Sequence, residues 1–319
     1  ALMSERDNDD DGIVNIFDPY PEGCPIGYYA TGGTCLEADP GHYADGVHPY
    51  EQFPCDPGSF QPSPGQSYCI DASPGNFAGD AASVEESPCE AGTYQPDSGQ
   101  TSCILADPGN YVSEEGSIRQ TQCSLGAYQD ASGGSTCIAA SPGYFVNTFA
   151  AVMQTPCPPG SYQMLDTATS CFQAGPGFHV PSEGSDSQQQ CNPGTFSAQQ
   201  GQANCTEASP GFFVVGLQQT SHSPCPRGEF QPSPGQTSCL ETMPGHYTDV
   251  EGSAEQKPCE AGSYQPDSGQ TSCIIADPGY YSTEGATSQS QCENGTYSSE
   301  SGQPSCTPAE PGFYVDLDG

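Results

Sequence analysis

The feature that most constrains the fold is a glycine that recurs every 17 residues from Gly41 to Gly279. In nearly every copy this glycine opens a Gly-x-aromatic triplet. Shifted copies at Gly27, Gly295 and Gly312 bring the number of 17-residue modules to eighteen. One module is too short to bury a hydrophobic core by itself, so it must pack on its neighbours. The sequence therefore predicts a linear repeat rather than one globular core.

The 18 cysteines follow the repeat and divide the modules into two types. In a cysteine module, cysteines stand three residues before the glycine and eleven after it, as Cys89 and Cys103 do. In the alternate, cysteine-free module both are absent together, and Ala106 and Gln120 hold these places in the next module. An even number of regularly spaced cysteines indicates an oxidised framework and hence an extracellular or cell-surface protein.

Two positions that lose their cysteines in the same modules are most simply partners in one disulfide. The alternative pairing joins the second cysteine of one module to the first cysteine of the next cysteine module, and it leaves Cys24 and Cys306 without partners. We therefore predict bonds within modules. The predicted pairs are Cys24–Cys35, Cys55–Cys69, Cys89–Cys103, Cys123–Cys137, Cys157–Cys171, Cys191–Cys205, Cys225–Cys239, Cys259–Cys273 and Cys292–Cys306.

Each module also has the pattern of a small β-hairpin. In "GTYQPDSGQTSCI", residues 92–95 alternate small and aromatic side chains, residues 96–99 have turn composition, and residues 101–104 fit a second strand. We predict that three columns of side chains form a continuous core. The columns are the triplet aromatics of the cysteine modules (Phe60, Tyr94, Tyr128, Tyr162, Phe196, Phe230, Tyr264, Tyr297), those of the cysteine-free modules (Tyr43, Phe77, Tyr111, Phe145, Phe213, Tyr247, Tyr281, Tyr314), and the residue after the second cysteine (Leu36, Ile70, Ile104, Ile138, Phe172, Leu240, Ile274).

The predicted fold is all-β, a disulfide-rich, elongated and solenoid-like rod of short hairpins with almost no helix. Residues 23–315 form about nine 34-residue repeats of two modules each. They are preceded by an acidic, calcium-binding leader at residues 1–22 and followed by a C-terminal tail at residues 316–319. Because only 33% of the residues are hydrophobic, one large buried core is not expected.

The charge of the chain excludes several classes of partner. Forty acidic residues face four basic ones, which gives a formal net charge of -36 at pH 7. Such a polyanion repels nucleic acids and anionic membrane surfaces. No apolar stretch has the length of a membrane span, so membrane insertion is not expected.

The stretch "DNDDDGIVNIFD" at residues 7–18 departs from the repeat and matches a calcium-binding loop. Its oxygen donors occupy loop positions 1, 3, 5, 9 and 12, a glycine allows the turn at position 6, and position 7 offers a backbone carbonyl. The predicted Ca²⁺ ligands are Asp7, Asp9, Asp11, Ile13 (through its carbonyl), Asn15 and Asp18. Because "PYPEGCP" follows where an EF-hand would need a helix, the stretch resembles a thrombospondin type-3 calcium repeat. The alternative is a disordered acidic leader.

A second resemblance covers nearly the whole chain, from Gly23 to Val315. The pattern C-x-x-G-x-[YF], then G-x-x-x-C and P-G-x-[YF], resembles the ephrin-receptor-like cysteine-rich repeat and is similar to the single-disulfide hairpins of tumour-necrosis-factor-receptor-like domains. The family commonly has a further cysteine before P-x-G, where this chain has Ala-Asp-Pro-Gly or Ala-Ser-Pro-Gly. The resemblance implies an extracellular scaffold or recognition role and carries over no catalytic residue.

Other candidate sites are few. Asn204 and Asn294 stand in N-x-T sequons and are candidate glycosylation sites of a secreted chain. His179 takes the place of a triplet aromatic, and we interpret it as a divergent packing residue rather than a metal ligand. We find no nucleophile and base pair and no phosphate-binding loop, so an enzyme is not expected.

These features favour an acidic extracellular structural protein, the subunit of a surface filament or a rigid stalk. We predict head-to-tail self-assembly in which Phe313, Tyr314, Asp316 and Asp318 meet the calcium loop of the next chain. A heterologous contact of this kind grows a filament. The alternative is an adhesin or receptor-like ectodomain for cell adhesion that binds a glycan or a protein ligand.

Overall fold

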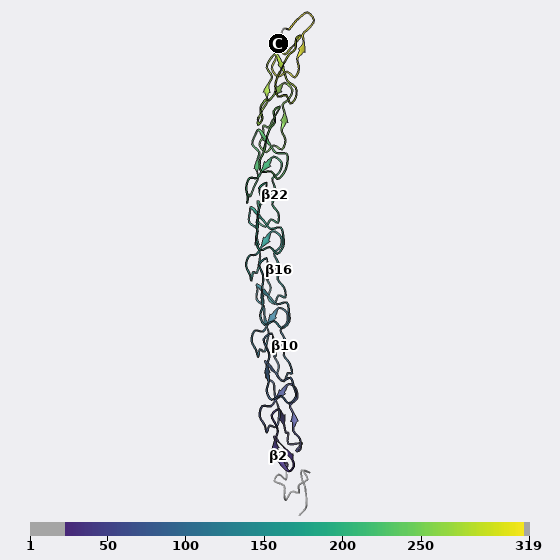
Figure 1. Ribbon diagram of the computed structural model, residues 1–319, viewed down its shortest axis with the longest axis vertical. Coiled ribbons are helices and arrows are strands. Elements are labelled where there is room, and N and C mark those ends of the chain that lie inside the picture. The colour runs from purple at the N-terminus through teal and green to yellow at the C-terminus, as the bar shows by residue number, and fades with distance from the viewer. Residues whose placement is uncertain (1–22, 316–319) are drawn as a thin grey trace, which may run out of the picture. The chain divides into compact units, whose positions relative to one another are not determined.

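The computed structural model describes residues 23–315 and contains strands and turns but no helix in that range (Figure 1). Its contacts group the described chain into two units. The N-terminal unit comprises residues 23–141, 145–155 and 166–170, and the C-terminal unit comprises residues 142–144, 156–165 and 171–315. Within each unit the chain is an elongated, all-β repeat of disulfide-bonded hairpins, which confirms the predicted fold class.

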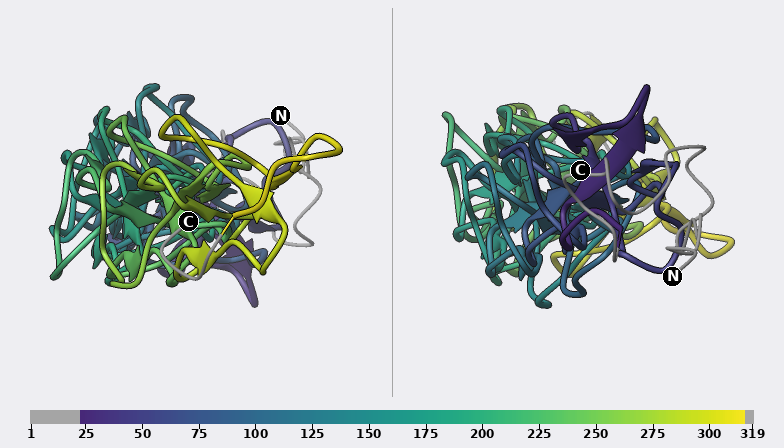
Figure 2. Two further views of the ribbon diagram at one scale, coloured as in Figure 1. Left: turned by 90° about the horizontal axis from the view of Figure 1, so that it is seen from above. Right: turned by 90° about the horizontal axis from the view of Figure 1, so that it is seen from below.

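All strands except the first two contain two residues, and the hairpin of β1 and β2 is the large purple one in the right-hand view of Figure 2. The strands are β1 (Tyr28–Thr31), β2 (Thr34–Glu37), β3 (His42–Tyr43), β4 (Phe53–Pro54), β5 (Ser59–Phe60), β6 (Ile70–Asp71), β7 (Asn76–Phe77), β8 (Ser87–Pro88), β9 (Thr93–Tyr94), β10 (Ile104–Leu105), β11 (Asn110–Tyr111), β12 (Thr121–Gln122), β13 (Ala127–Tyr128), β14 (Ile138–Ala139), β15 (Tyr144–Phe145), β16 (Thr155–Pro156), β17 (Ser161–Tyr162), β18 (Phe172–Gln173), β19 (Phe178–His179), β20 (Gln189–Gln190), β21 (Thr195–Phe196), β22 (Thr206–Glu207), β23 (Phe212–Phe213), β24 (Ser223–Pro224), β25 (Glu229–Phe230), β26 (Leu240–Glu241), β27 (His246–Tyr247), β28 (Lys257–Pro258), β29 (Ser263–Tyr264), β30 (Ile274–Ile275), β31 (Tyr280–Tyr281), β32 (Ser290–Gln291), β33 (Thr296–Tyr297) and β34 (Thr307–Pro308).

Each module from Gly27 to Gly295 is one antiparallel hairpin that begins at a tight turn. In the module of β5 and β6, Phe60 pairs with Ile70. The turn before β5 is closed by the Ser59 N–H, which donates to the Asp56 carbonyl at 3.0 Å. Gly58 has a φ of 98° at the third position of this turn. Since a type II turn needs a positive φ there, the module glycine, which proline precedes in most modules, explains where the hairpins start.

Backbone hydrogen bonds join each module to the next one. In this ladder the module glycine donates to a carbonyl of the following module, as the Gly58 N–H does to the Ala78 carbonyl at 2.7 Å. In the other direction, the Cys89 N–H donates to the Gly75 carbonyl at 2.8 Å. Both contacts recur with the repeat. Polar backbone groups in the interior therefore find partners although the strands are very short.

The module glycine also allows modules of one type to stack on each other. A Cβ added to Gly75 would lie 2.2 Å from the carbonyl oxygen of Gly116, which belongs to the module 34 residues further on. The position that supplies this carbonyl is not restricted to glycine, because Ala150, Thr167 and Gln218 occupy it with positive φ. Among the described residues, the module glycines from Gly27 to Gly262 are the ones that a close approach of two backbones prevents from bearing a side chain.

The interior differs from the predicted core. Its two columns are the residue three places before the module glycine, such as Cys89 and Ala106 (each 0% exposed), and the residue three places after it, such as Val112 (3% exposed). The prediction of three aromatic and aliphatic columns is wrong in its last column, since Ile104 is 44% exposed, and the triplet aromatics such as Tyr94 are half-buried. Backbones that hydrogen-bond across the interior leave room only for narrow side chains there.

Candidate functional site

The cysteine modules are closed by disulfides that join the same pairs as the within-module prediction. Cys89 and Cys103, for example, have their Cα atoms 5.7 Å apart, a normal distance for a disulfide. The first cysteine of such a pair is buried from Cys55 onward, and no free cysteine occurs among the described residues. The bond ties the start of the hairpin to its returning strand.

In most cysteine-free modules a glutamine or glutamate at the place of the second cysteine closes the hairpin by binding the backbone N–H of the residue after the place of the first cysteine. Gln120 accepts a hydrogen bond from the Asp107 N–H at 2.6 Å, and its Nε2 donates to the Asp107 carboxylate at 2.7 Å. We call this contact the glutamine clasp. Equivalent bonds from a backbone N–H join Asp39 to Gln52 (2.7 Å), Ser73 to Glu86 (2.6 Å), Ser141 to Gln154 (2.8 Å), Gly175 to Gln188 (2.7 Å), Met243 to Gln256 (2.8 Å) and Asp277 to Gln289 (2.7 Å). The recurrence of glutamine in place of the second cysteine is the sequence signal for this role, which the sequence analysis missed.

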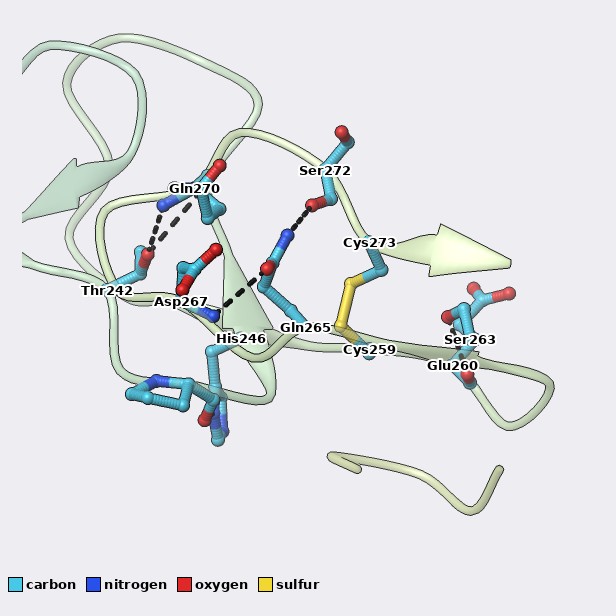
Figure 3. Close-up of a disulfide and its surroundings, with 11 residues drawn as sticks. Thr242, His246, Cys259, Glu260, Ser263, Gln265, Asp267, Gln270, Ser272 and Cys273 are labelled. Atoms are coloured by element: carbon cyan, nitrogen blue, oxygen red, sulfur yellow. Dashed lines mark hydrogen bonds between the residues drawn. A yellow bond between two sulfur atoms is a disulfide. The ribbon is translucent and has the colours of Figure 1, made fainter. Parts of the chain in front are cut away.

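A second glutamine fills the interior of most cysteine modules. The Gln265 side chain donates to the Ser272 carbonyl at 2.8 Å and accepts from the Asp267 N–H at 3.1 Å, beside the Cys259–Cys273 disulfide (Figure 3). Gln265 is 4% exposed. Both the oxygen and the nitrogen of this buried side-chain amide are thus hydrogen-bonded, and these bonds hold the loop of the hairpin in one conformation.

His222 replaces the clasp glutamine in one module of the C-terminal unit. Its Nδ1 is buried and has no hydrogen-bond partner among the described residues. Its ring stacks on Phe212 at 4.1 Å between centroids and lies 5.0 Å from Phe196. No hydrogen bond joins it to the N–H of Ser209, the backbone group that a clasp glutamine would bind. This module is therefore packed by aromatic contact instead of being clasped.

Replacing His222 with glutamine is expected to slow hydrogen exchange of the Ser209 amide and to stabilise its module by about 1 kcal/mol, because a clasp forms and an unpaired buried nitrogen is removed. Hydrogen exchange followed by mass spectrometry measures the effect. His222→Leu is the control, since leucine also packs against the aromatic rings but offers no hydrogen-bond acceptor. Equal protection of Ser209 in both variants would contradict a clasp.

The predicted calcium ligands and the residues Asp316 and Asp318 lie outside the described residues. Within residues 23–315, no group of three or more His, Cys, Asp or Glu side chains is placed to hold a metal ion. Phe313 and Tyr314 are 75% and 88% exposed. The sequon residues Asn204 and Asn294 are both exposed, so each is accessible to modification. The Nδ1 of His179 lies within hydrogen-bond distance of the Ala203 carbonyl oxygen, at 3.3 Å.

One cation of the chain sits between a ring and a carboxylate. The Lys257 ammonium lies 2.7 Å from an Asp249 oxygen and 5.9 Å from the ring centroid of Tyr247. The hydrogen bond with Lys257 lowers the pKa of Asp249, and the same bond raises the pKa of Lys257. Lysine stands here on the strand opposite Tyr247, where most cysteine-free modules have a neutral residue.

A groove recurs between the triplet aromatic of a cysteine-free module and the disulfide of the following module. The groove at Phe77 has a volume of about 580 Å³. It is lined by Phe77, Ser87, Pro88, Glu90, Thr93, Ser102, Cys103 and Glu115. Equivalent grooves of about 510 Å³ and 250 Å³ lie at Tyr247 with Glu260, and at Tyr111 with Ser124. Figure 3 shows Glu260, Ser263 and Ser272 around the disulfide of the second groove. An acidic side chain is present in two of these three grooves.

Comparison with known proteins agrees with this architecture. No curated protein sequence matches the chain significantly. In residues 23–315 the structure has no helix that is both long and apolar enough to cross a membrane. Residues 75–123 and 211–259 match the family model described as tyrosine-protein kinase ephrin type A/B receptor-like. These two segments of the chain are therefore similar to an ephrin-receptor-like cysteine-rich repeat, and in the structure they consist of tandem disulfide-bonded β-hairpins.

Proposed function

We propose that the chain is an extracellular structural scaffold, either a stalk or a subunit of a surface fibre. The observation that carries this proposal is that nearly every module is closed, by a disulfide or by a glutamine clasp, and is also hydrogen-bonded to its neighbour. In repeat proteins, stability and stiffness come from such nearest-neighbour contacts. Most buried side chains of a module serve its closure or its stacking, as a spacer requires.

The extracellular location rests on two observations. Nine disulfides persist only in an oxidising environment, and the matched repeat belongs to receptor ectodomains. The formal charge of -36 is compatible with an exposed position at a cell surface. A strongly charged protein stays soluble there and resists non-specific association. A non-catalytic role is part of the proposal.

Solution X-ray scattering tests the scaffold proposal. We expect the oxidised chain at physiological salt to scatter as a long, thin particle. Reduction of the disulfides is expected to raise its flexibility, because half of the modules lose their covalent closure. The control is the oxidised chain at 1 M salt, where charge repulsion is screened over about 3 Å and an extension caused only by repulsion would collapse. A compact profile of the oxidised chain would contradict a spacer.

The second candidate is a receptor-like or adhesive ectodomain, which the family match favours. Its ligand would bind to exposed side chains, because the interior columns are filled. The exposed aliphatic residues after the second cysteine, such as Ile70, Ile104 and Ile138 (41%, 44% and 42% exposed), offer a regular surface for it. Saturable binding of one protein or glycan to the immobilised chain would support this candidate, and scattering alone does not decide it.

Self-assembly with calcium remains a proposal within the scaffold function. Its support is the spacing of oxygen donors at residues 7–18 and the exposure of Phe313 and Tyr314. Sedimentation of the whole chain in calcium should show larger species than in EDTA, and Asp11→Ala should abolish the difference. Oligomers that ignore EDTA would contradict calcium as the linker.

A further inference from the structure

The recurring groove is a surface feature that the scaffold function does not use. In the groove at Phe77, one wall is the half-buried aromatic ring and the other is formed by the edge of the Cys89–Cys103 module. The Glu90 and Glu115 carboxylates both line it, and neither has a hydrogen bond or an ion pair to a described residue. Hydroxyl groups of Ser87, Thr93 and Ser102 complete the lining.

Another module shows how the chain itself pairs a cation with a triplet aromatic. At the equivalent aromatic of another module, Tyr247, the Lys257 ammonium lies over the ring and binds a carboxylate. Lys257 stands twelve residues after the module glycine, on the strand paired with the aromatic. Ser87 has this place beside Phe77, so the ring there faces a short, neutral side chain. The carboxylate that binds Lys257 is Asp249, and Gly79 has its place in the Phe77 module. The acids beside the Phe77 ring are instead Glu90 and Glu115, and no lysine among the described residues lines this groove.

Charge favours an external cation over other occupants. The chain has 40 acidic and four basic residues, so its own cations are too few to neutralise the grooves. A ring face attracts ammonium and guanidinium groups, and a carboxylate holds them by charge-assisted hydrogen bonds. A second copy of this chain would bring mainly negative charge to the same surface, so it is disfavoured.

We propose that the groove lined by Phe77, Glu90 and Glu115 binds lysine or arginine side chains of a basic segment of a partner protein. The groove at Tyr247 and Glu260 is a second, weaker site of this kind because Lys257 already lies over its ring. The groove at Tyr111 lacks a carboxylate at the matching place, where Ser124 stands, and binds least. Binding at this groove does not depend on the scaffold function, because it requires only the local arrangement of the modules.

Carbodiimide cross-linking with a tetralysine peptide locates the site, because it joins the lysine amine to whichever carboxylate lies beside it. We expect yields at Glu90 and Glu115 to exceed those at the exposed loop residues Asp97 and Asp130 by roughly tenfold, as an affinity difference of that size would give. A glycine-serine peptide of equal length that carries one lysine is the control probe for simple amine reactivity. Cross-links distributed evenly over the acidic residues would overturn the site.

Two variants of equal charge separate the groove from the general field of the protein. Ser87→Lys introduces a cation where Lys257 stands in its own module, a position already shown to accept lysine, and should reduce the groove cross-links several-fold. Ser132→Lys adds the same charge on an exposed turn of the N-terminal unit and should leave them nearly unchanged. Both variants must keep the far-UV spectrum and the disulfide mass map of the parent chain. An equal loss in both, or displacement of the peptide by a neutral oligosaccharide, would overturn the proposal.

Discussion

Replacing Cys89 and Cys103 together with alanine is expected to destabilise their module by about 3 kcal/mol, the contribution of a disulfide that closes a loop of this length. The bond spans a sequence separation of 14 residues and its first cysteine is 0% exposed. Because contacts in the repeat are local, the loss should remain within this module and its neighbours. Hydrogen exchange of peptides from residues 89–112, compared with peptides from residues 225–248, measures it.

The cysteine-free modules supply the matched control for this prediction. Cys89→Ala with Cys103→Gln copies the clasp of Ala106 and Gln120, in which the glutamine binds a backbone N–H at 2.6 Å. We expect this variant to recover about 1 kcal/mol of the loss, the usual contribution of one hydrogen bond. If the glutamine variant exchanged as fast as the double alanine variant, the clasp would not be the functional replacement of the disulfide.

Gly75→Ala is expected to cost about 3 kcal/mol or more, because two penalties add at this residue. Its φ of 89° is unfavourable for any residue with a Cβ, and the added methyl group would lie 2.2 Å from the Gly116 carbonyl oxygen. That oxygen belongs to a backbone held by the ladder, so it has no rotamer to change. Hydrogen exchange of the amides in both modules measures the loss of stacking.

Gly116→Ala isolates the first of these penalties. Gly116 has a φ of 68°, and a Cβ there would have no other atom within 4 Å. Ala150 and Gln218 occupy the equivalent place in other modules with positive φ. We therefore expect a cost of only about 1 kcal/mol, that of the left-handed backbone alone. Similar losses for Gly75→Ala and Gly116→Ala would contradict the close packing of modules 34 residues apart.

Some of the candidate sites can be predicted from residues close in the sequence, whereas others are visible only in the tertiary structure. The joint loss of two cysteines in alternate modules is enough to choose partners such as Cys89 and Cys103, because both ends of the bond lie in one short hairpin. The glutamine that closes the alternate module stands at a matching position, but its partner is a backbone N–H, which carries no sequence signature. The groove at Phe77 combines residues of three successive modules, so only their stacking reveals it.

The sequence by itself determined the 17-residue period, the all-β class and the pairs of cysteines. These features depend on residues that are close in the chain: a glycine followed by an aromatic residue, and two cysteines at a fixed separation. Only the tertiary structure decided which side chains face inward. Ile104 has the character of a core residue and yet is 44% exposed, because the backbones of successive modules approach so closely that the interior admits Cys89, Ala106 and Val112 instead.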